Sequence, residues 1–476
     1  MTLPASSSRD AWPAFALICL SVFMVSLDAT AMVASFPALR SHFQETTPAT
    51  LSWTLNAYTL VYAALLTPMG GWTDRRGHKR AFLLGTWLFT AASLLCGLAK
   101  TPATLIAARA FQGLGAALLT PASLALALSL FPAPRRPLAV SLWGATAALA
   151  AAVGPAFGSW LIDALSWRAI FGINVPLGLF LLWRGRSLLA ESSRPGAGRR
   201  TDWLGAMVLG AGGGLLVLGI VRANDAGWRS LATAGTLGGG FLLLAAFVGS
   251  ARGRPDAAID LSLFRNRTYR FANLATLVFG ACFGMMFLTF YLFMTGVWHY
   301  AQSLAGLAAL PGPLVVIPTA IAGGRLVPRL GHRPLLVAGG VLYALAQLWY
   351  FFRVGPQADY LGAWLPGQLA SGVAIGLILP SLAGAAAAHL PASSLATGNA
   401  VNQAVRQLGM AIGIAIAVAC AGQAGAGLGD FQRIYLLLAA GGIGTALLSL
   451  PINTRPAGGA PVSAGETASV PAKRAA

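Results

Sequence analysis

The feature that most constrains this chain is a succession of about fourteen apolar segments, each about 20 residues long. A helix of that length crosses the hydrocarbon core of a bilayer and satisfies its own backbone hydrogen bonds there. The predicted fold is therefore an all-α integral membrane protein with about 14 transmembrane helices. The predicted spans are residues 13–36, 50–70, 81–99, 102–125, 138–160, 168–188, 203–221, 231–250, 270–294, 304–324, 334–352, 361–385, 396–421 and 432–451.

Composition and charge agree with this prediction. Hydrophobic residues make up 57% of the chain and charged residues 9%, whereas a soluble domain carries about 25% charged residues. Lys and Arg are concentrated in the loops on the side of the two termini, so the positive-inside rule predicts a multi-pass protein of a bacterial cytoplasmic (inner) membrane with both termini cytoplasmic. Basic loops facing anionic lipid explain the net charge of +19, and no nucleic acid partner is expected.

Two polar stretches, residues 190–202 and 250–260, divide the spans into groups of six, two and six. The sequence therefore predicts two six-helix bundles plus two additional helices. The expected parts are a cytoplasmic N-terminus (1–12), a first bundle (13–188), a two-helix insert with cytoplasmic linkers (189–260), a second bundle (261–451) and a disordered cytoplasmic tail (452–476).

Asp28 is the one carboxylate that lies deep inside an apolar segment. Such a charge costs about 2.5–3.5 kcal/mol at the centre of a membrane helix and usually serves a function. Arg109 lies within another apolar segment, so we interpret the two as a proton site with a permanent counter-charge. The alternatives are a structural Asp28 bonded to Ser26 or Thr30, and an Arg109 bonded to backbone carbonyls.

The sequence lacks the usual signatures of an enzyme. There is no GxxxxGK[ST] or HExxH pattern, and the four cysteines have no CxxC spacing. Neither an enzymatic activity nor a cofactor or metal is expected, and transport would draw on an ion gradient or on another subunit.

Residues 70–80 and 324–333 follow the second span of each six-span block and share a skeleton of Gly, then Arg, then Gly-His and a basic residue. Such an internal repeat is typical of secondary transporters. The first copy, Gly70-x-Trp-x-Asp74-Arg75-x-Gly77-His-Lys-Arg80, resembles the loop 2–3 signature of the major facilitator superfamily. In the second copy Pro328 replaces the acid.

Further segments are similar to signatures of the fourteen-span drug:proton antiporter branch of that superfamily. They are Leu27-Asp28-Ala-Thr30, Arg109-Ala-Phe-Gln112, Gly154-Pro155-Ala-Phe-Gly158 and Trp167-Arg168 through Gly178. The chain departs from the branch at Val33, Ala150 and Ser159. The resemblance implies a proton-coupled antiporter that exports drugs or lipophilic small molecules by alternating access. The alternatives are a dedicated exporter of one endogenous metabolite or self-made antibiotic, and a non-transporting receptor or scaffold.

The resemblance also implies roles for the two glycine-containing motifs. Loop 2–3 would form a charged latch in which Asp74 faces the N-terminus of the helix that starts near Ser393; the alternative is that its cations only set topology. Gly154, Pro155 and Gly158 would kink span 5 and let helices approach closely, although GxxxG also occurs in plain packing. The expected latch residues are Gly70, Asp74, Arg75, Gly77 and Arg80.

An aromatic stripe in span 9 is the expected wall of a substrate cavity. Phe279, Phe283, Phe287 and Phe290 recur on one helical face, although contact with lipid or core packing explains such a stripe equally well. The candidate cavity residues are Gln112, Asn174, Phe283, Phe287, Asn402 and Arg406, with snorkelling of Arg406 as its alternative. The expected partners are a small-molecule substrate, protons and the lipid bilayer, and a monomer is compatible with the sequence.

Overall fold

The structure is a computed structural model of the 476-residue chain. It describes residues 11–132, 135–192, 202–254, 257–390, 394–421 and 426–454. Most of the predicted N-terminal and C-terminal tails, much of the first linker and Ser393 lie outside these residues.

Helices α1 to α8 make up the N-terminal half. Several begin at residues suited to a helix start: the Thr47 hydroxyl accepts from the Thr50 N–H, and Thr101 and Thr104 form a capping box around the first turn, which begins with Pro102. The helices are α1 (Ala11–Ala34), α2 (Phe36–His42), α3 (Pro48–Arg76), α4 (His78–Leu98), α5 (Pro102–Leu130), α6 (Arg136–Ala164), α7 (Ala169–Gly172) and α8 (Asn174–Leu188).

The remaining helices form the two-helix insert and the C-terminal half. The insert consists of α9 (Trp203–Ala226) and α10 (Leu231–Ala251). The C-terminal half contains η2 (Leu261–Arg265), α11 (Arg267–Gly296), α12 (Gln302–Ala309), α13 (Pro311–Leu330), α14 (His332–Arg353), η3 (Tyr360–Trp364), α15 (Leu365–Ala387), α16 (Leu395–Ala421) and α17 (Leu428–Ser449).

Within the described residues, 12 helices are long and apolar enough to cross a membrane. The predictions of spans at 50–70 and 168–188 fall on α3 and α8, which are not among these 12. Helix α8 has only 15 residues, and α3 carries several buried polar side chains, among them Ser52, Thr54 and Asn56. The all-helical membrane fold is confirmed, whereas the count of 14 spans stays a prediction.

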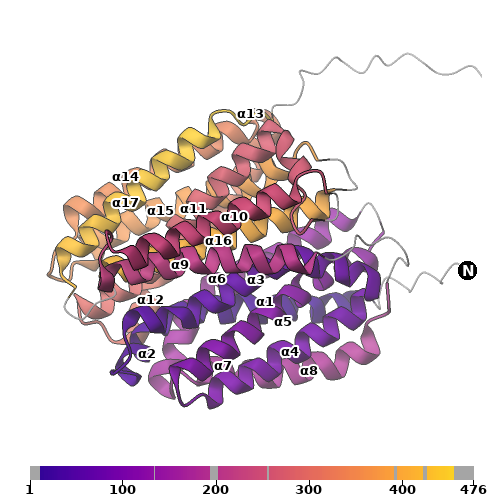
Figure 1. Ribbon diagram of the computed structural model, residues 1–476, viewed down its shortest axis with the longest axis horizontal. Helices are drawn as coiled ribbons and strands as arrows, with labels where there is room; N and C mark the ends of the chain where they lie inside the picture. The colour runs from indigo at the N-terminus through magenta and orange to yellow at the C-terminus, as the bar shows by residue number, and fades with distance from the viewer. Residues whose placement is uncertain are drawn as a thin grey trace, which may run out of the picture.

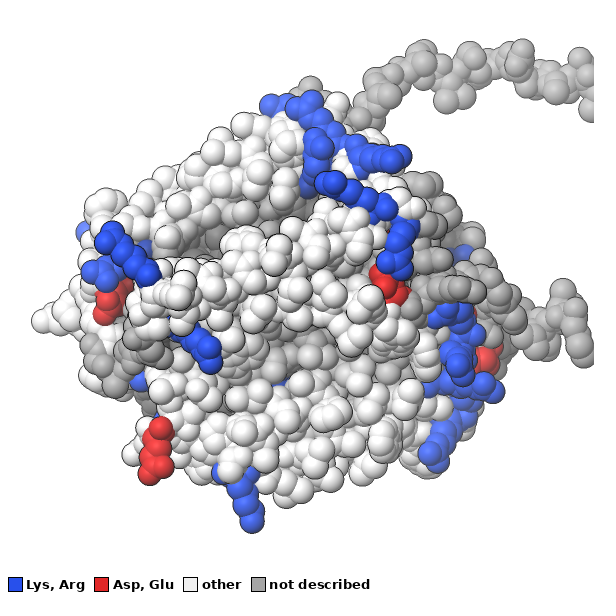
Figure 2. Space-filling model, viewed as in Figure 1, with Lys and Arg blue, Asp and Glu red and all other residues white. Residues whose placement is uncertain are grey.

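The surface has the pattern of a membrane protein. Large hydrophobic side chains are exposed, among them Trp87, Trp183, Leu231, Phe241 and Phe352. Figure 2 shows Lys, Arg, Asp and Glu in two groups, one along the left and lower left and one from the top to the right, with an uncharged belt running obliquely between them. Because exposed apolar side chains are stable in lipid and not in water, this belt is the surface that faces the hydrocarbon core.

The two halves lie side by side, as Figure 1 shows, with α9 and α10 running along their boundary. Helix α9 packs against both halves: Val217 and Val221 cluster with Leu60 of α3 and with Ala411 and Ala415 of α16. The insert therefore contacts the line along which α3 and α16 meet.

Candidate functional site

The centre of the N-terminal half contains a buried ion pair. Asp28 of α1 and Arg109 of α5 are each 1% exposed, and an Arg109 Nη1 lies 2.7 Å from Asp28 Oδ2. The Arg109 Nε also donates to the Thr54 carbonyl at 3.0 Å, and its guanidinium stacks over the Tyr58 ring at 4.3 Å. Two charges that were separated by 81 residues in the sequence thus neutralise each other.

Two amides complete the coordination of the Asp28 carboxylate. Gln112 Nε2 and Asn174 Nδ2 donate to Asp28 Oδ1 at 2.9 and 2.7 Å, and Arg109 also donates to Gln112. Both amides further contact the Ser93 hydroxyl. Asp28 therefore accepts hydrogen bonds from α5 and α8, and the network also includes α4.

The geometry also shows how the neighbours of Asp28 on its own helix are bonded. Thr30 donates its hydroxyl to the backbone carbonyls of Ser26 and Leu27, so it does not satisfy the Asp28 carboxylate. The partners of Asp28 come from other helices, and its role as a proton site stays a prediction. Gln112 and Asn174 donate to Asp28 in this network, and their expected role as substrate-cavity residues stays a prediction.

Helix α6 packs directly behind this part of α1. A Cβ on Gly154 would overlap the Thr30 hydroxyl, and one on Gly158 would lie 2.7 Å from the Ala31 Cβ. These glycines allow the two helix backbones to approach closely. The equivalent pair in the C-terminal half repeats this contact: a Cβ on Gly409 or Gly413 of α16 would overlap backbone oxygens of α11.

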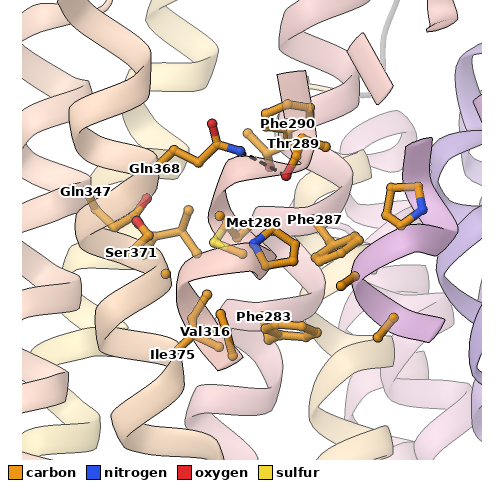
Figure 3. A pocket seen from close by; sticks show the side chains of 18 of the residues that line it. Phe283, Met286, Phe287, Thr289, Phe290, Val316, Gln347, Gln368, Ser371 and Ile375 are labelled. Carbon is orange, nitrogen blue, oxygen red and sulfur yellow. Dashed lines mark hydrogen bonds between the residues drawn. The ribbon is translucent and has the colours of Figure 1, made fainter. Parts of the chain in front are cut away.

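A cavity of about 200 Å³ lies among helices of the C-terminal half, where α6 of the N-terminal half borders it. Phe283 and Phe287 line it, together with Met286 and Phe290 on the same face of α11, as Figure 3 shows. The opposite wall comes from α14 and α15, and α6 closes one side with Pro155. The aromatic stripe is therefore a cavity wall over these positions, while Phe279 is fully buried in the core.

No charged side chain lines this cavity among the described residues. Its polar groups are amides and hydroxyls, including Gln347, Gln368 and Ser371. These three residues were not predicted from the sequence, although a Gln inside a strongly apolar segment is a signal of the same kind as Asp28. Ser93 and Tyr58 at the ion pair were missed for a different reason, because Ser and Tyr are common in membrane helices.

Asn402 and Arg406 lie on α16 away from the cavity wall. Asn402 donates to Asn273 and Thr276 of α11 at 3.1 and 3.0 Å. The half-buried Arg406 donates from Nε to Gln403 at 2.8 Å. Asn402 thus joins α16 to α11, and its expected contact with substrate stays a prediction.

Two residues shape loop 2–3: Gly77 within the loop and Glu191 from the segment that follows α8. Gly77 has φ 105°, a conformation that favours glycine. The Glu191 carboxylate accepts from the backbone N–H groups of Lys79 and Arg80 at 3.1 and 3.3 Å and so caps the start of α4. Asp74 pairs with His78 at 3.1 Å, and its expected place opposite the helix that starts near Ser393 stays a prediction.

The other latch residues lie close by. Gly70 of α3 faces Pro121 of α5, and Arg75 lies in the last turn of α3. The second loop copy has a related arrangement: Gly331 has φ 73°, and the Thr454 hydroxyl accepts from the His332 N–H at 2.8 Å. The segment following the last helix of each half therefore caps α4 or α14.

A metal site is not found in the described part of the chain, where no three His, Cys, Asp or Glu side chains come together. Two similar helical bundles, with a buried ion pair in one and an uncharged cavity beside the other, are the arrangement typical of a secondary-transporter fold. The chain belongs to the Major Facilitator Superfamily, whose family model matches residues 18–414 and, in a second match, residues 272–474.

Curated relatives agree with this membership. The chain is 35% identical to an uncharacterized MFS-type transporter of Mycobacterium tuberculosis, over 78% of this chain and 63% of the relative. It is 36% identical to the cephamycin export protein CmcT of Amycolatopsis lactamdurans, over 79% and 78% of the two chains. It is 34% identical to the multidrug resistance protein Stp of the same Mycobacterium species, over 75% and 66%. The chain thus spans less than two thirds of two of these relatives.

The fold has a counterpart among solved structures. A D-xylose–proton symporter superposes with a TM-score of 0.66 at 14% identity, over 93% of this chain and 97% of that one. At this identity the likeness concerns the fold alone.

Proposed function

We propose that this protein is a proton-coupled antiporter that exports drugs or lipophilic small molecules by alternating access. The observation that carries the proposal is the Asp28–Arg109 pair, fully buried within a membrane bundle. Buried acids in membrane spans commonly relay protons, and an inward proton yields about 2.3 kcal/mol per 100 mV of membrane potential. The names of the relatives CmcT and Stp support export as the direction of transport.

The contacts around Asp28 suggest how a proton acts. A proton on Oδ2 would remove the ion pair with Arg109, while Oδ1 still accepts from Gln112 and Asn174. The bonds that hold α1 to α5 would weaken, and those to α8 would remain. Arg109 keeps its charge and so opposes a second cation in the site.

Helix α6 would transmit this change to the cavity. Its glycine face, Gly154 and Gly158, contacts α1 within a turn of Asp28. Its other face lines the cavity with Pro155 and the alanines 148, 151 and 152. A shift of α1 against α6 therefore changes the cavity wall, as alternating access between two rocking halves requires.

The proposed topology has fourteen spans in a bacterial cytoplasmic membrane, with both termini cytoplasmic. Helix α3 has 29 residues and at 1.5 Å per residue would extend about 43 Å, more than the bilayer core of about 30 Å. Helices α7 and α8 together would extend about 30 Å from Ala169 to Leu188. The functional units would be the bundles 13–188 and 261–451, with 189–260 as an insert.

A susceptibility panel tests the function. Cells deprived of their own efflux pumps would express the wild type, Asp28→Asn or the control Glu45→Gln, whose acid is exposed, and be exposed to antibiotics of several chemical classes. We expect the wild type and Glu45→Gln to protect, and Asp28→Asn or an uncoupler to remove the protection at equal protein level. Export by Asp28→Asn that an uncoupler still abolishes would contradict the proton site.

The same panel separates the substrate alternatives. Protection against several unrelated classes supports a multidrug exporter. Protection against one compound supports a dedicated exporter, the alternative favoured by the name of CmcT. Absence of protection and of uncoupler-sensitive efflux across the panel would count against export.

A further inference from the structure

We infer that the cavity in the C-terminal half binds an uncharged aromatic molecule that carries hydroxyl or carbonyl groups. Only one part of the inference rests on the proposed function, namely that this molecule is the exported substrate. It concerns the chemical class of the ligand, and three features of the cavity wall support it.

The first feature is the absence of charge from the wall. Among the described residues, neither an acid that would attract a cation nor a base that would attract an anion lines the cavity. Asp28 and Arg109 already neutralise each other within hydrogen-bond distance and do not line it. An ion entering this cavity would lose its hydration without gaining a partner, so an uncharged ligand is favoured.

The second feature is an aromatic wall. Phe283 and Phe287 of α11 lie with ring centroids 5.2 Å apart, and Phe290 packs edge-on against Trp364 at 5.3 Å. Figure 3 shows Phe283, Phe287 and the flexible Met286 on neighbouring turns of α11. Flat aromatic ligands pack well between such rings, and Met adapts to their outline.

The third feature is a pair of buried polar atoms with no protein partner. Gln347 is 0% exposed; its Nε2 donates to Ser371 at 3.2 Å, while its Oε1 makes no hydrogen bond among the described residues. The Tyr435 hydroxyl, on a residue 2% exposed, likewise lacks one. Both residues line the cavity. Buried polar atoms normally have partners, so a ligand hydroxyl or carbonyl fits here.

Gln368 shows by contrast what a structural amide looks like in the same cavity. Its Nε2 donates to the carbonyls of Ala308 and Ala309 at 2.9 and 3.0 Å, and its Oε1 accepts from the Tyr360 hydroxyl at 3.2 Å. Gln368 is thus satisfied by the protein and joins α12 to α15. Gln347 and Tyr435 are the groups left to recognise a ligand.

Binding to the purified full-length protein in nanodiscs tests the inference without a proton gradient. The probes are 1,8-dihydroxyanthraquinone, unsubstituted anthraquinone and the cationic dye ethidium, and tryptophan quenching reports binding. We expect the dihydroxy compound to bind most tightly and ethidium least. Tyr435→Phe should weaken binding of the dihydroxy compound by several-fold to about tenfold, the worth of one hydrogen bond, and leave anthraquinone unchanged.

The matched control is Tyr343→Phe, which removes another buried hydroxyl without a partner, on α14 and outside the cavity. It should leave all three affinities unchanged, and Gln347→Met should act as Tyr435→Phe does. Ethidium binding as tightly as the neutral probes, or equal losses in the control, would overturn the inference. Binding with this pattern but no gradient-driven export would leave the cavity assignment intact and refute the proposed function. Export that depends on Asp28, in a protein that does not show this binding pattern, would support the proposed function and refute the cavity assignment.

Discussion

The two halves of this protein are built alike but place their polar groups differently. In the N-terminal half, Asp28 of α1 pairs with Arg109 within a buried hydrogen-bond network. The corresponding first helix of the C-terminal half, α11, presents Phe283 and Phe287 to a cavity without charged walls. Asn402 and Asn273 supply its buried polar contact, which is neutral. The two halves thus share one framework, with the buried charges in one half and the uncharged cavity beside the other, and α6 contacts both.

The largest expected effect concerns the charge in the N-terminal half. Arg109→Met leaves Asp28 buried with no cation, and breaking a buried pair in this way costs about 3–5 kcal/mol. Asn402→Leu, which breaks the neutral contact in the C-terminal half, should cost only about 1–3 kcal/mol. Unfolding of the purified variants in nanodiscs, followed by heat or denaturant, measures both.

The double variant Asp28→Leu with Arg109→Met separates charge from packing. Because neither charge is then left unpaired, it should recover much of the stability that Arg109→Met loses. A double variant as unstable as Arg109→Met would show that the two side chains stabilise the bundle through packing and not through charge. The two halves would then no longer differ in the role of their buried charge.

The second prediction compares the close helix contacts of the two halves. An added methyl at Gly413 meets the backbone oxygen of Ala281, which cannot move without its helix, whereas one at Gly154 meets the Thr30 hydroxyl, which can rotate. Gly413→Ala should therefore cost about 1–3 kcal/mol and Gly154→Ala clearly less. Thermal unfolding of the two variants gives the order, and the reverse order would mean that α1 and α6 form the tighter contact.

Much of the N-terminal site was predictable because charge is rare in membrane helices. A buried Asp28 and a buried Arg109 each need a polar partner inside the membrane, and pairing with each other meets both needs. The place of Gln112 and Asn174 was not predictable, because an amide suits either a charged network or a cavity, and the choice depends on how each helix is rotated in the bundle. The sequence also could not reveal that Glu191, 114 residues after Gly77, would cap α4, since that contact depends on where α8 ends.

The third prediction concerns the caps at the start of α4 and α14. Glu191 accepts from two backbone N–H groups, whereas Thr454 accepts from the backbone N–H of His332. Glu191→Ala should cost about 1–2 kcal/mol and Thr454→Val about 0.5–1 kcal/mol, the range of helix caps. Amide hydrogen exchange at the first turns of α4 and α14 shows where each variant loses stability. An equal increase in exchange in the two variants would show that the two caps contribute alike.

The smallest effect is expected at Asp74, where the two loop copies differ most in sequence. Its side chain is 56% exposed and pairs with His78 one turn later, and exposed pairs of this kind contribute about 0–1 kcal/mol. Asp74→Asn should therefore change stability less than Glu191→Ala does. It should still lower transport more than Pro328→Ala, because the second copy has no acid at that position. Rates measured in proteoliposomes under one fixed proton gradient check this order. If Asp74→Asn and Pro328→Ala both leave the rate unchanged, the charges of loop 2–3 act on topology alone, and the contrast between the halves is confined to Asp28 and the cavity.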